Sequence, residues 1–222
     1  MQTAFLFDMD GTMLNNMQFH LMAWEKAIAE AGSDLKGEAL FKQLYGKNSE
    51  VIERIFGKGK FSKEEMEKMA AKKDAYYREF YKPHIKLLPG LKEFLIEAKR
   101  QGVLLAIATS AIRENIDFAI DQLHIRPLFD GLISESDVEK SKPDPETFFK
   151  AAKQLNILPS HCIVFEDAPK GVKAAQRAGM KAVAVLTSGK KEDFEPFTNV
   201  IRAITDFRFL NVEELIYLAN PV

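Results

Sequence analysis

Two aspartates, a glycine and a hydroxyl follow a short apolar run near the start of the chain. The run is Ala4-Phe5-Leu6-Phe7, and Asp8-Met9-Asp10-Gly11-Thr12 comes directly after it. Four apolar residues that end at a turn signal are typical of a fully buried strand. Two carboxylates held together at the tip of such a strand repel each other unless a cation or a proton relieves the repulsion. This spacing therefore indicates a chemical site.

Polar residues also follow later apolar runs. Thr109-Ser110 follows residues 103–108, Glu166-Asp167 follows residues 162–165, and Lys142 lies in Ser141-Lys142-Pro143-Asp144-Pro145. In an open parallel sheet, the ligand crevice lies outside the carboxyl ends of the strands, so we expect these groups to converge. Oxygen ligands suit Mg²⁺ and a lysine suits a phosphate, which predicts a magnesium-dependent phosphoryl-transfer site.

Hydrophobic periodicity predicts the elements that must position these residues. We expect strands at residues 4–7, 103–108, 131–133, 162–165, 182–186 and 200–204, the last of them at an edge of the sheet. We expect helices at residues 90–100, 113–123, 145–155, 170–178 and 212–218. Strands that alternate with helices of this length predict an α/β fold with a parallel sheet wound on both faces.

Residues 15–83 have a different sequence pattern, which is rich in helix signals and charged residues and poor in strand signals. Helices are expected at residues 17–31, 40–44, 49–56 and 62–81. Asn16 is a candidate cap of the first helix, and Ser62 with Glu65 matches a capping box. We therefore expect an inserted helical domain at 15–83 and a core formed by residues 1–14 and 84–222.

The composition excludes several classes of partner. The 31 Lys and Arg residues nearly balance 32 Asp and Glu residues, so no strong field attracts nucleic acid or an anionic membrane. The one cysteine, Cys162, excludes an intramolecular disulfide and fits a reducing compartment. No basic and apolar leader precedes Ala4, and no apolar stretch is long enough for a membrane span. We expect a soluble, cytoplasmic monomer.

Taken in order, these motifs are similar to the four motifs of the haloacid dehalogenase superfamily, in its β-phosphoglucomutase-like branch. The resemblance rests on Asp8 to Thr12, Thr109 after its strand, Lys142 before Pro143, and Glu166-Asp167, and it covers nearly the whole chain. It implies a Rossmann-like core with a helical cap inserted after the first strand. It also implies an aspartyl-phosphate intermediate and Mg²⁺ as cofactor.

The resemblance assigns the carboxylates to separate roles. Asp8 would be the nucleophile, and Asp10 would be the general acid that protonates the leaving oxygen and then the base that activates water or an alcohol. Mg²⁺ would be held by Asp8, the main-chain carbonyl of Asp10, and Asp167. Glu166 would bind the metal directly or would support the residues that do. To act as an acid, Asp10 must hold a proton near neutral pH, above its ordinary pKa of about 3.9.

The remaining core residues would bind the phosphate. Thr109 would donate its hydroxyl to a phosphate oxygen, and Lys142 would neutralise the charge that develops there. Ser110 and Ala111 would offer backbone N–H groups if a helix begins just beyond them.

Four residues of the helical insertion are candidate substrate contacts. His20 and Trp24 lie on one helix face and resemble in position a His and a Trp of β-phosphoglucomutases, with core packing as an equal alternative. Lys73 aligns with a substrate-facing cap lysine, although Lys72 beside it favours a solvated face. A mutase would place an arginine after Gly46, whereas this chain has Lys47-Asn48-Ser49, and a lysine such as Lys47 offers only a point charge.

The sequence thus predicts a Mg²⁺-dependent phosphatase or phosphotransferase that acts on a small phosphorylated metabolite, with a sugar phosphate preferred. Hydrolysis is favoured because the mutase arginine is missing, and β-phosphoglucomutase activity is the alternative. A non-catalytic binding protein is disfavoured because all four motifs keep their chemical groups. A dehalogenase is disfavoured because the carboxylates suit a phosphate better, and a calcium loop because Met13 stands where an oxygen ligand is needed.

Overall fold

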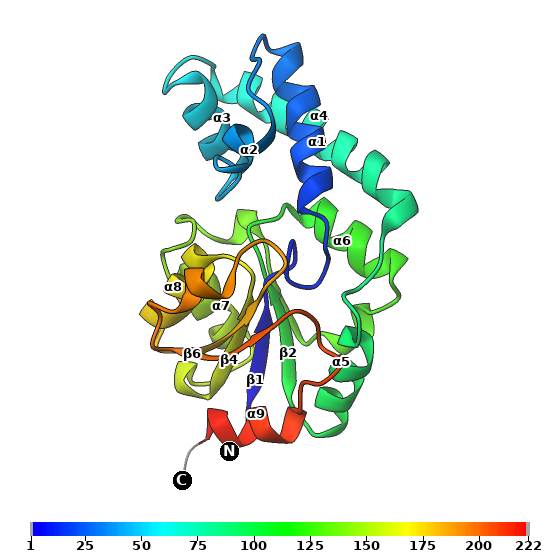
Figure 1. The fold of residues 1–222 in the computed structure, drawn as a ribbon, viewed down its shortest axis with the longest axis vertical. Coiled ribbons are helices and arrows are strands. Elements are labelled where there is room, and N and C mark those ends of the chain that lie inside the picture. The colour runs from blue at the N-terminus through cyan, green and yellow to red at the C-terminus, as the bar shows by residue number, and fades with distance from the viewer. Residues whose placement is uncertain (1, 221–222) are drawn as a thin grey trace. The chain divides into compact units, whose positions relative to one another are not determined.

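In a computed structural model, which describes residues 2–220, the first apolar run forms a strand inside a parallel sheet (Figure 1). The six strands of this part of the chain lie in the order β3-β2-β1-β4-β5-β6. They are β1 (Ala4–Phe7), β2 (Leu104–Ala108), β3 (Gly131–Ile133), β4 (Cys162–Glu166), β5 (Lys181–Val185) and β6 (Val200–Ile204). The predicted parallel sheet is therefore confirmed, as is the place of β6 at its edge.

The chain divides into two compact units, and the sheet belongs to one of them. This unit, which we call the α/β unit, comprises residues 2–15 and 86–220, while Asn16–Ile85 form a second, helical unit. The helices of the α/β unit are α5 (Leu91–Arg100), α6 (Arg113–Gln122), α7 (Glu146–Gln154), α8 (Pro169–Arg177) and α9 (Val212–Ala219). Short 3₁₀ helices lie at Lys82–His84, Arg126–Leu128, Glu135–Asp137, Pro159–His161 and Lys191–Phe194.

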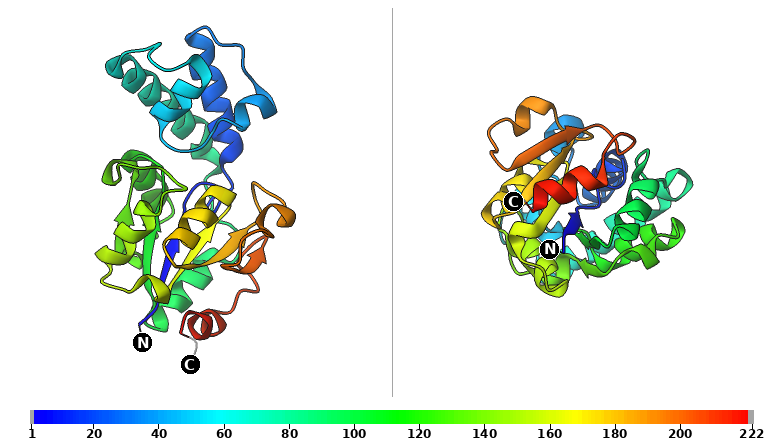
Figure 2. Two further views of the ribbon diagram at one scale, coloured as in Figure 1. Left: turned by 90° about the vertical axis from the view of Figure 1, so that its left-hand side faces the viewer. Right: turned by 90° about the horizontal axis from the view of Figure 1, so that it is seen from below.

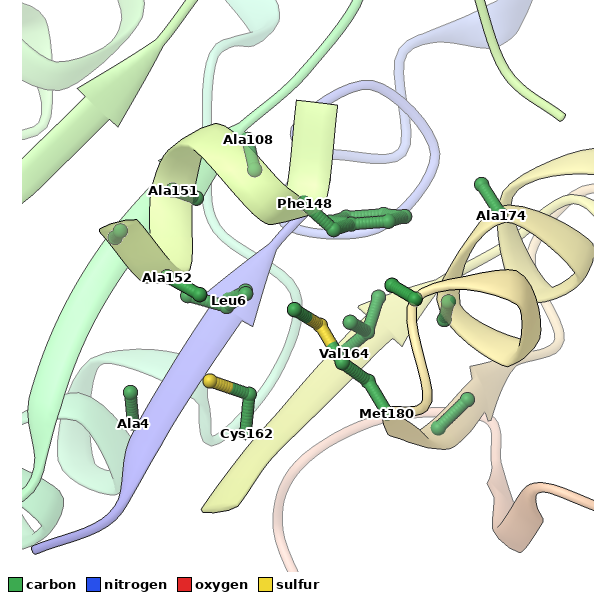
Figure 3. Close-up of a cluster of buried hydrophobic side chains, with 14 of the residues drawn as sticks. Ala4, Leu6, Ala108, Phe148, Ala151, Ala152, Cys162, Val164, Ala174 and Met180 are labelled. Atoms are coloured by element: carbon green, nitrogen blue, oxygen red, sulfur yellow. The ribbon is translucent and has the colours of Figure 1, made fainter. Parts of the chain in front are cut away.

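Side chains alternate between the two faces along each strand, so apolar strands place apolar side chains on both faces of the sheet. Helices cover both of these faces (Figure 2). Ala4 and Leu6 of β1 belong to a buried cluster with Phe148 of α7 and residues of α8 (Figure 3). On the opposite face, Phe5 stacks on Phe94 of α5 with 5.7 Å between the ring centroids. β1 is thus apolar at every position because both of its faces are buried.

The helical unit contains α1 (Met17–Glu30), α2 (Gly37–Phe41), α3 (Asn48–Phe56) and α4 (Lys63–Tyr81). Ser62 caps α4 as predicted, since its hydroxyl accepts from Glu65 N and Glu65 Oε2 accepts from Ser62 N. The prediction of a helix at residues 40–44 was wrong by three residues. The observed helix, α2, begins at Gly37, whose backbone N donates to Glu25 Oε1 of α1 at 2.8 Å.

Two other predictions for this unit need correction. Asn16 stands at the N-cap position of α1 but makes no capping bond with its side chain, and its Nδ2 instead donates to Tyr77 Oη at 2.7 Å. Lys73 does not lie on a solvated face, because it is only 4% exposed and its Nζ lies 2.8 Å from Asp74 Oδ1. Oxygens of Asp74 and Asn48 replace the water that the Lys73 ammonium loses on burial.

No helix within residues 2–220 is long and apolar enough to cross a membrane.

The buried thiol of Cys162 yields a first prediction. Burial in β4 raises the pKa of Cys162 to about 12, so the thiol stays protonated at pH 8. We expect the native protein not to react with a thiol reagent such as Ellman's reagent, and the protein in denaturant to release about one equivalent of the coloured product. Rapid labelling of the native protein would contradict this placement of Cys162.

The buried pair of Lys73 and Asp74 yields a second prediction. Asp74→Ala leaves the Lys73 ammonium buried without a carboxylate, which should lower the free energy of unfolding by about 3–5 kcal/mol. Urea denaturation followed by circular dichroism measures the change. Lys72→Ala is the matched control, because Lys72 is exposed, and it should have little effect. Equal stability of the Asp74→Ala and Lys72→Ala proteins would refute the role of the pair.

Candidate active site

The predicted site residues of the α/β unit follow three neighbouring strands. Asp8 follows β1, Thr109 follows β2, and Glu166 ends β4 with Asp167 next to it. Since β2, β1 and β4 are adjacent and parallel, their carboxyl ends open at one edge of the sheet. The structure thus brings Asp8, Glu166 and Asp167 together there, all of them buried.

Lys142 lies between two of these carboxylates. Its Nζ is 2.7 Å from Asp8 Oδ1, 2.7 Å from Glu166 Oε1 and 3.2 Å from the carbonyl oxygen of Ala108. The centroid of the Phe148 ring also lies 4.7 Å from Nζ. Lys142 is therefore held at the nucleophile candidate, although 134 residues separate the two in sequence.

Burial and neighbouring charges shift the pKa values of three groups in the site. Burial raises the pKa of Asp8 to about 7; the Lys142 ammonium opposes this rise, and the charges of Glu166 and Asp10 add to it. Burial likewise raises the pKa of Asp167 well above its usual range, with a further rise caused by Glu166 and Asp8. Burial alone would lower the pKa of Lys142, but the two carboxylates beside it outweigh burial and raise it. The site thus favours an additional cation.

Two glycines allow the carboxylates to pack against the backbone. Gly11 has φ +80°, and a Cβ added to it would lie 2.0 Å from Asp167 Oδ2. A Cβ added to Gly171, at the start of α8, would lie 1.8 Å from Glu166 Oε1. Any side chain at either position would displace an acidic group of the site, so both positions need glycine.

The acidic residues differ in how they could serve a metal. Glu166 uses both oxygens within the protein, since Oε1 accepts from Lys142 and Oε2 accepts from Ala168 N at 3.0 Å. Asp167 Oδ1 lies 3.4 Å from the Thr12 hydroxyl. Within residues 2–220, no three His, Cys, Asp or Glu side chains gather as a ready metal cage. Mg²⁺ is ordinarily held by one or two carboxylates together with waters and substrate phosphates, so Asp8 and Asp167 fit it as donors.

Asp10 lies in the loop that follows β1. Its backbone pairs with Leu14, and the loop is closed by Met13 N, which donates to the carbonyl of Met9 at 2.9 Å. Asp10 is half-buried, and it is close enough to Asp8 for its charge to raise the pKa of that residue.

The phosphate-binding candidates differ partly from expectation. Thr109 is buried, and its hydroxyl oxygen accepts from Ala111 N at 3.2 Å, so the Ala111 N–H that we expected for the phosphate already has a partner. Accepting this bond leaves the Thr109 hydroxyl able to donate its own hydrogen, and its donation to a phosphate oxygen stays a prediction. Ser110 is half-buried, and α6 begins at Arg113, close behind it as expected.

The other four candidates belong to the helical unit. His20 stacks on Tyr77 with 3.8 Å between the ring centroids, and Trp24 lies in the buried core with Ile28. Lys47 is the N-cap residue of α3, and its backbone N donates to Glu50 Oε2 at 2.9 Å. Lys73 pairs with Asp74, as described above. Contact of these four residues with a substrate stays a prediction.

Two residues near the site were missed by sequence reasoning. Thr187 and Ser188 follow β5, and the Thr187 hydroxyl donates to the carbonyl of Gly11. The Ser188 side chain lies beside Asp167, where its hydrogen bonding lowers the pKa of that carboxyl against the rise that burial causes. The signal was present, because two hydroxyls come directly after the predicted strand at residues 182–186, next to the strand that ends in Glu166.

Comparison with known proteins agrees with this geometry. Residues 5–185 match the family model of haloacid dehalogenase-like hydrolases. The chain is 29% identical over 209 residues to validoxylamine A 7'-phosphate phosphatase of Streptomyces hygroscopicus subsp. limoneus, covering 93% of this chain and 96% of the relative. It is 30% identical over 189 residues to β-phosphoglucomutase of Bacillus subtilis, covering 82% of each.

Solved structures show the same relationship. The crystal structure of β-phosphoglucomutase from Clostridium difficile matches with a TM-score of 0.87 at 30% identity, covering 99% of this chain and 98% of that one. The chain therefore belongs to the haloacid dehalogenase-like hydrolases, in the branch that contains β-phosphoglucomutase.

Proposed function

We propose that this enzyme is a Mg²⁺-dependent phosphatase that acts on a small phosphorylated metabolite, a sugar phosphate, through a phosphorylated Asp8. The observation that carries the proposal is the Lys142 ammonium, held 2.7 Å from the carboxylate of Asp8 among buried acidic groups. A carboxylate attacks a phosphate dianion poorly because both are negative. A fixed positive charge beside the nucleophile lowers that obstacle.

Each residue then has a defined part in the reaction. Asp8 Oδ attacks phosphorus while the bond to the leaving oxygen breaks, and Asp10 supplies the proton that the leaving alkoxide needs. Asp10 then takes a proton from water, whose oxygen attacks the same phosphorus and releases inorganic phosphate and free Asp8. Lys142 and the Thr109 hydroxyl stabilise the negative charge on the phosphoryl oxygens. When bound by Asp8, Asp167 and the carbonyl of Asp10, Mg²⁺ would supply further positive charge for those oxygens.

Hydrolysis is the first choice because of the helical unit. The segment after Gly46 carries Lys47, Asn48 and Ser49 in place of the mutase arginine, and Asn48 Nδ2 donates to Asp74 Oδ2 at 2.7 Å. A lysine cannot grip a second phosphate with two parallel bonds as arginine does. In this proposal the helical unit is the cap that admits water to the phosphorylated Asp8.

β-Phosphoglucomutase activity is the second candidate. The relative from Bacillus subtilis and the crystal structure from Clostridium difficile both carry that name and match most of the chain. The same core residues serve both reactions, because transfer differs from hydrolysis only in the acceptor, an alcohol in place of water.

Replacement of the nucleophile tests the chemistry. Asp8→Asn keeps the size of the side chain but removes the attacking carboxylate, so kcat for p-nitrophenyl phosphate should fall by at least about 10³-fold. Circular dichroism should show a folded protein. Asp34→Asn, in an exposed loop of the helical unit, is the matched control and should keep full activity. Activity that survives in Asp8→Asn would show that Asp8 is not the nucleophile.

A direct comparison of products separates the two candidate functions. With β-glucose 1-phosphate and a panel of other phosphate esters, we expect release of inorganic phosphate to exceed formation of glucose 6-phosphate. The Asp8→Asn protein gives the background for both assays. Isomerisation faster than phosphate release, with glucose 1,6-bisphosphate present as primer, would favour the mutase.

A further inference from the structure

Two hydroxyls that follow β5 reach the catalytic loop and one of the acidic residues. We propose that Thr187 and Ser188 are positioning residues, which fix the loop after Asp8 and the orientation of the Asp167 carboxylate for binding Mg²⁺. This inference rests on the proposed function, because it concerns the metal ligands of that same site.

Thr187 connects strands that are not neighbours. Its hydroxyl donates to the carbonyl oxygen of Gly11, in the loop after β1, although β4 lies between β1 and β5 in the sheet. The amide of Gly11 is also engaged, since its N–H donates to the carbonyl of Leu14 at 2.8 Å. Both polar groups of the residue directly after Asp10 are therefore fixed, and the direction of the Asp10 backbone is fixed with them.

Ser188 acts on the acidic residue itself. Its Oγ and Asp167 Oδ2 both lie close to Gly11, and Thr12 Oγ1 lies 3.4 Å from Asp167 Oδ1. The position that a Cβ on Gly11 would take lies 3.0 Å from Ser188 Oγ and 2.0 Å from Asp167 Oδ2. The Asp167 carboxylate is thus enclosed by Gly11, Thr12 and Ser188, which come from two separate parts of the chain and leave it few orientations.

The segment that carries the two hydroxyls is anchored on both sides. β5 ends at Val185 and is paired with both β4 and β6. After Gly189, the chain enters the 3₁₀ helix Lys191–Phe194, where Lys190 N donates to Asp193 Oδ2 at 2.8 Å. Hydroxyls on a segment held in this way are suited to orient other groups, because they do not have to be ordered first.

Magnesium affinity tests the role of Ser188. Isothermal titration with MgCl₂ should show about tenfold weaker binding for Ser188→Ala than for the wild type. Loss of a residue that orients a metal ligand typically lowers metal affinity or activity about 10–100-fold. Ser188→Thr keeps a hydroxyl and should recover most of the affinity. Ser160→Ala, at an exposed serine of the α/β unit, is the matched control and should bind as the wild type does.

The rate of turnover tests the role of Thr187. Thr187→Val keeps the shape of the side chain but removes the donor, so kcat for p-nitrophenyl phosphate at saturating Mg²⁺ should fall about tenfold with KM little changed. Thr187→Ser should restore kcat. Thr205→Val changes an exposed threonine just beyond the end of β6 and should leave kcat unchanged.

Several results would overturn the inference. Wild-type Mg²⁺ affinity in Ser188→Ala together with wild-type kcat in Thr187→Val would do so, as would equal losses in the two control variants. If Ser188→Ala does not fold, Ser188→Cys replaces it, with the same weakening expected from its poorer donor. A wild-type protein that binds Mg²⁺ but hydrolyses no ester would refute the proposed function alone, because the affinity comparison for Ser188 would still stand.

Discussion

The Lys142 ammonium lies 2.7 Å from an oxygen of Asp8 and 2.7 Å from an oxygen of Glu166, and all three side chains are almost fully buried. Without this positive charge, Asp8, Glu166 and Asp167 would leave three carboxylates in an apolar environment, a large electrostatic cost. A buried ion pair contributes little net stability compared with apolar packing of the same volume. We therefore interpret the cluster as a feature retained for chemistry, with the stability of the unit supplied elsewhere.

That stability comes from the sheet on which the cluster stands. Phe7 and Phe165, paired across β1 and β4, stack with 4.5 Å between their centroids and 9° between their planes. Phe207 packs on Phe165 at 5.6 Å, and the small side chains of the other face lie under α7 and α8. Asp8 follows β1 and Glu166 ends β4, so these packed strands keep the charged groups in place. A catalytic site needs this, because a misplaced group loses most of its contribution to the rate.

In the proposed function, the α/β unit carries out the chemistry and the helical unit carries the groups that would distinguish substrates. Its buried lysine, Lys73, is already balanced by Asp74 at 2.8 Å. A compensated ammonium attracts a second phosphate less than a free one does, which agrees with the proposed hydrolysis of a monophosphate rather than a reaction that depends on a bisphosphate. Relatives named for each of the two activities match most of the chain, so membership of the family does not decide between them.

Local patterns were enough to predict the strands, most helices, the N-terminal capping of α4 by Ser62, and the convergence of Asp8, Lys142 and Asp167. These predictions succeeded because alternation, helical spacing and the end of a parallel strand are properties of short segments and of the sheet they build. The tertiary structure alone decided that Lys73 is buried, that Asn16 bonds to Tyr77, and that Ser188 reaches Asp167. Asn16 and Tyr77 are 61 residues apart, and Ser188 and Asp167 follow different strands, so a local pattern does not pair them. Asp74 is next to Lys73 in sequence, but only the packing of the helical unit shows that both side chains are buried.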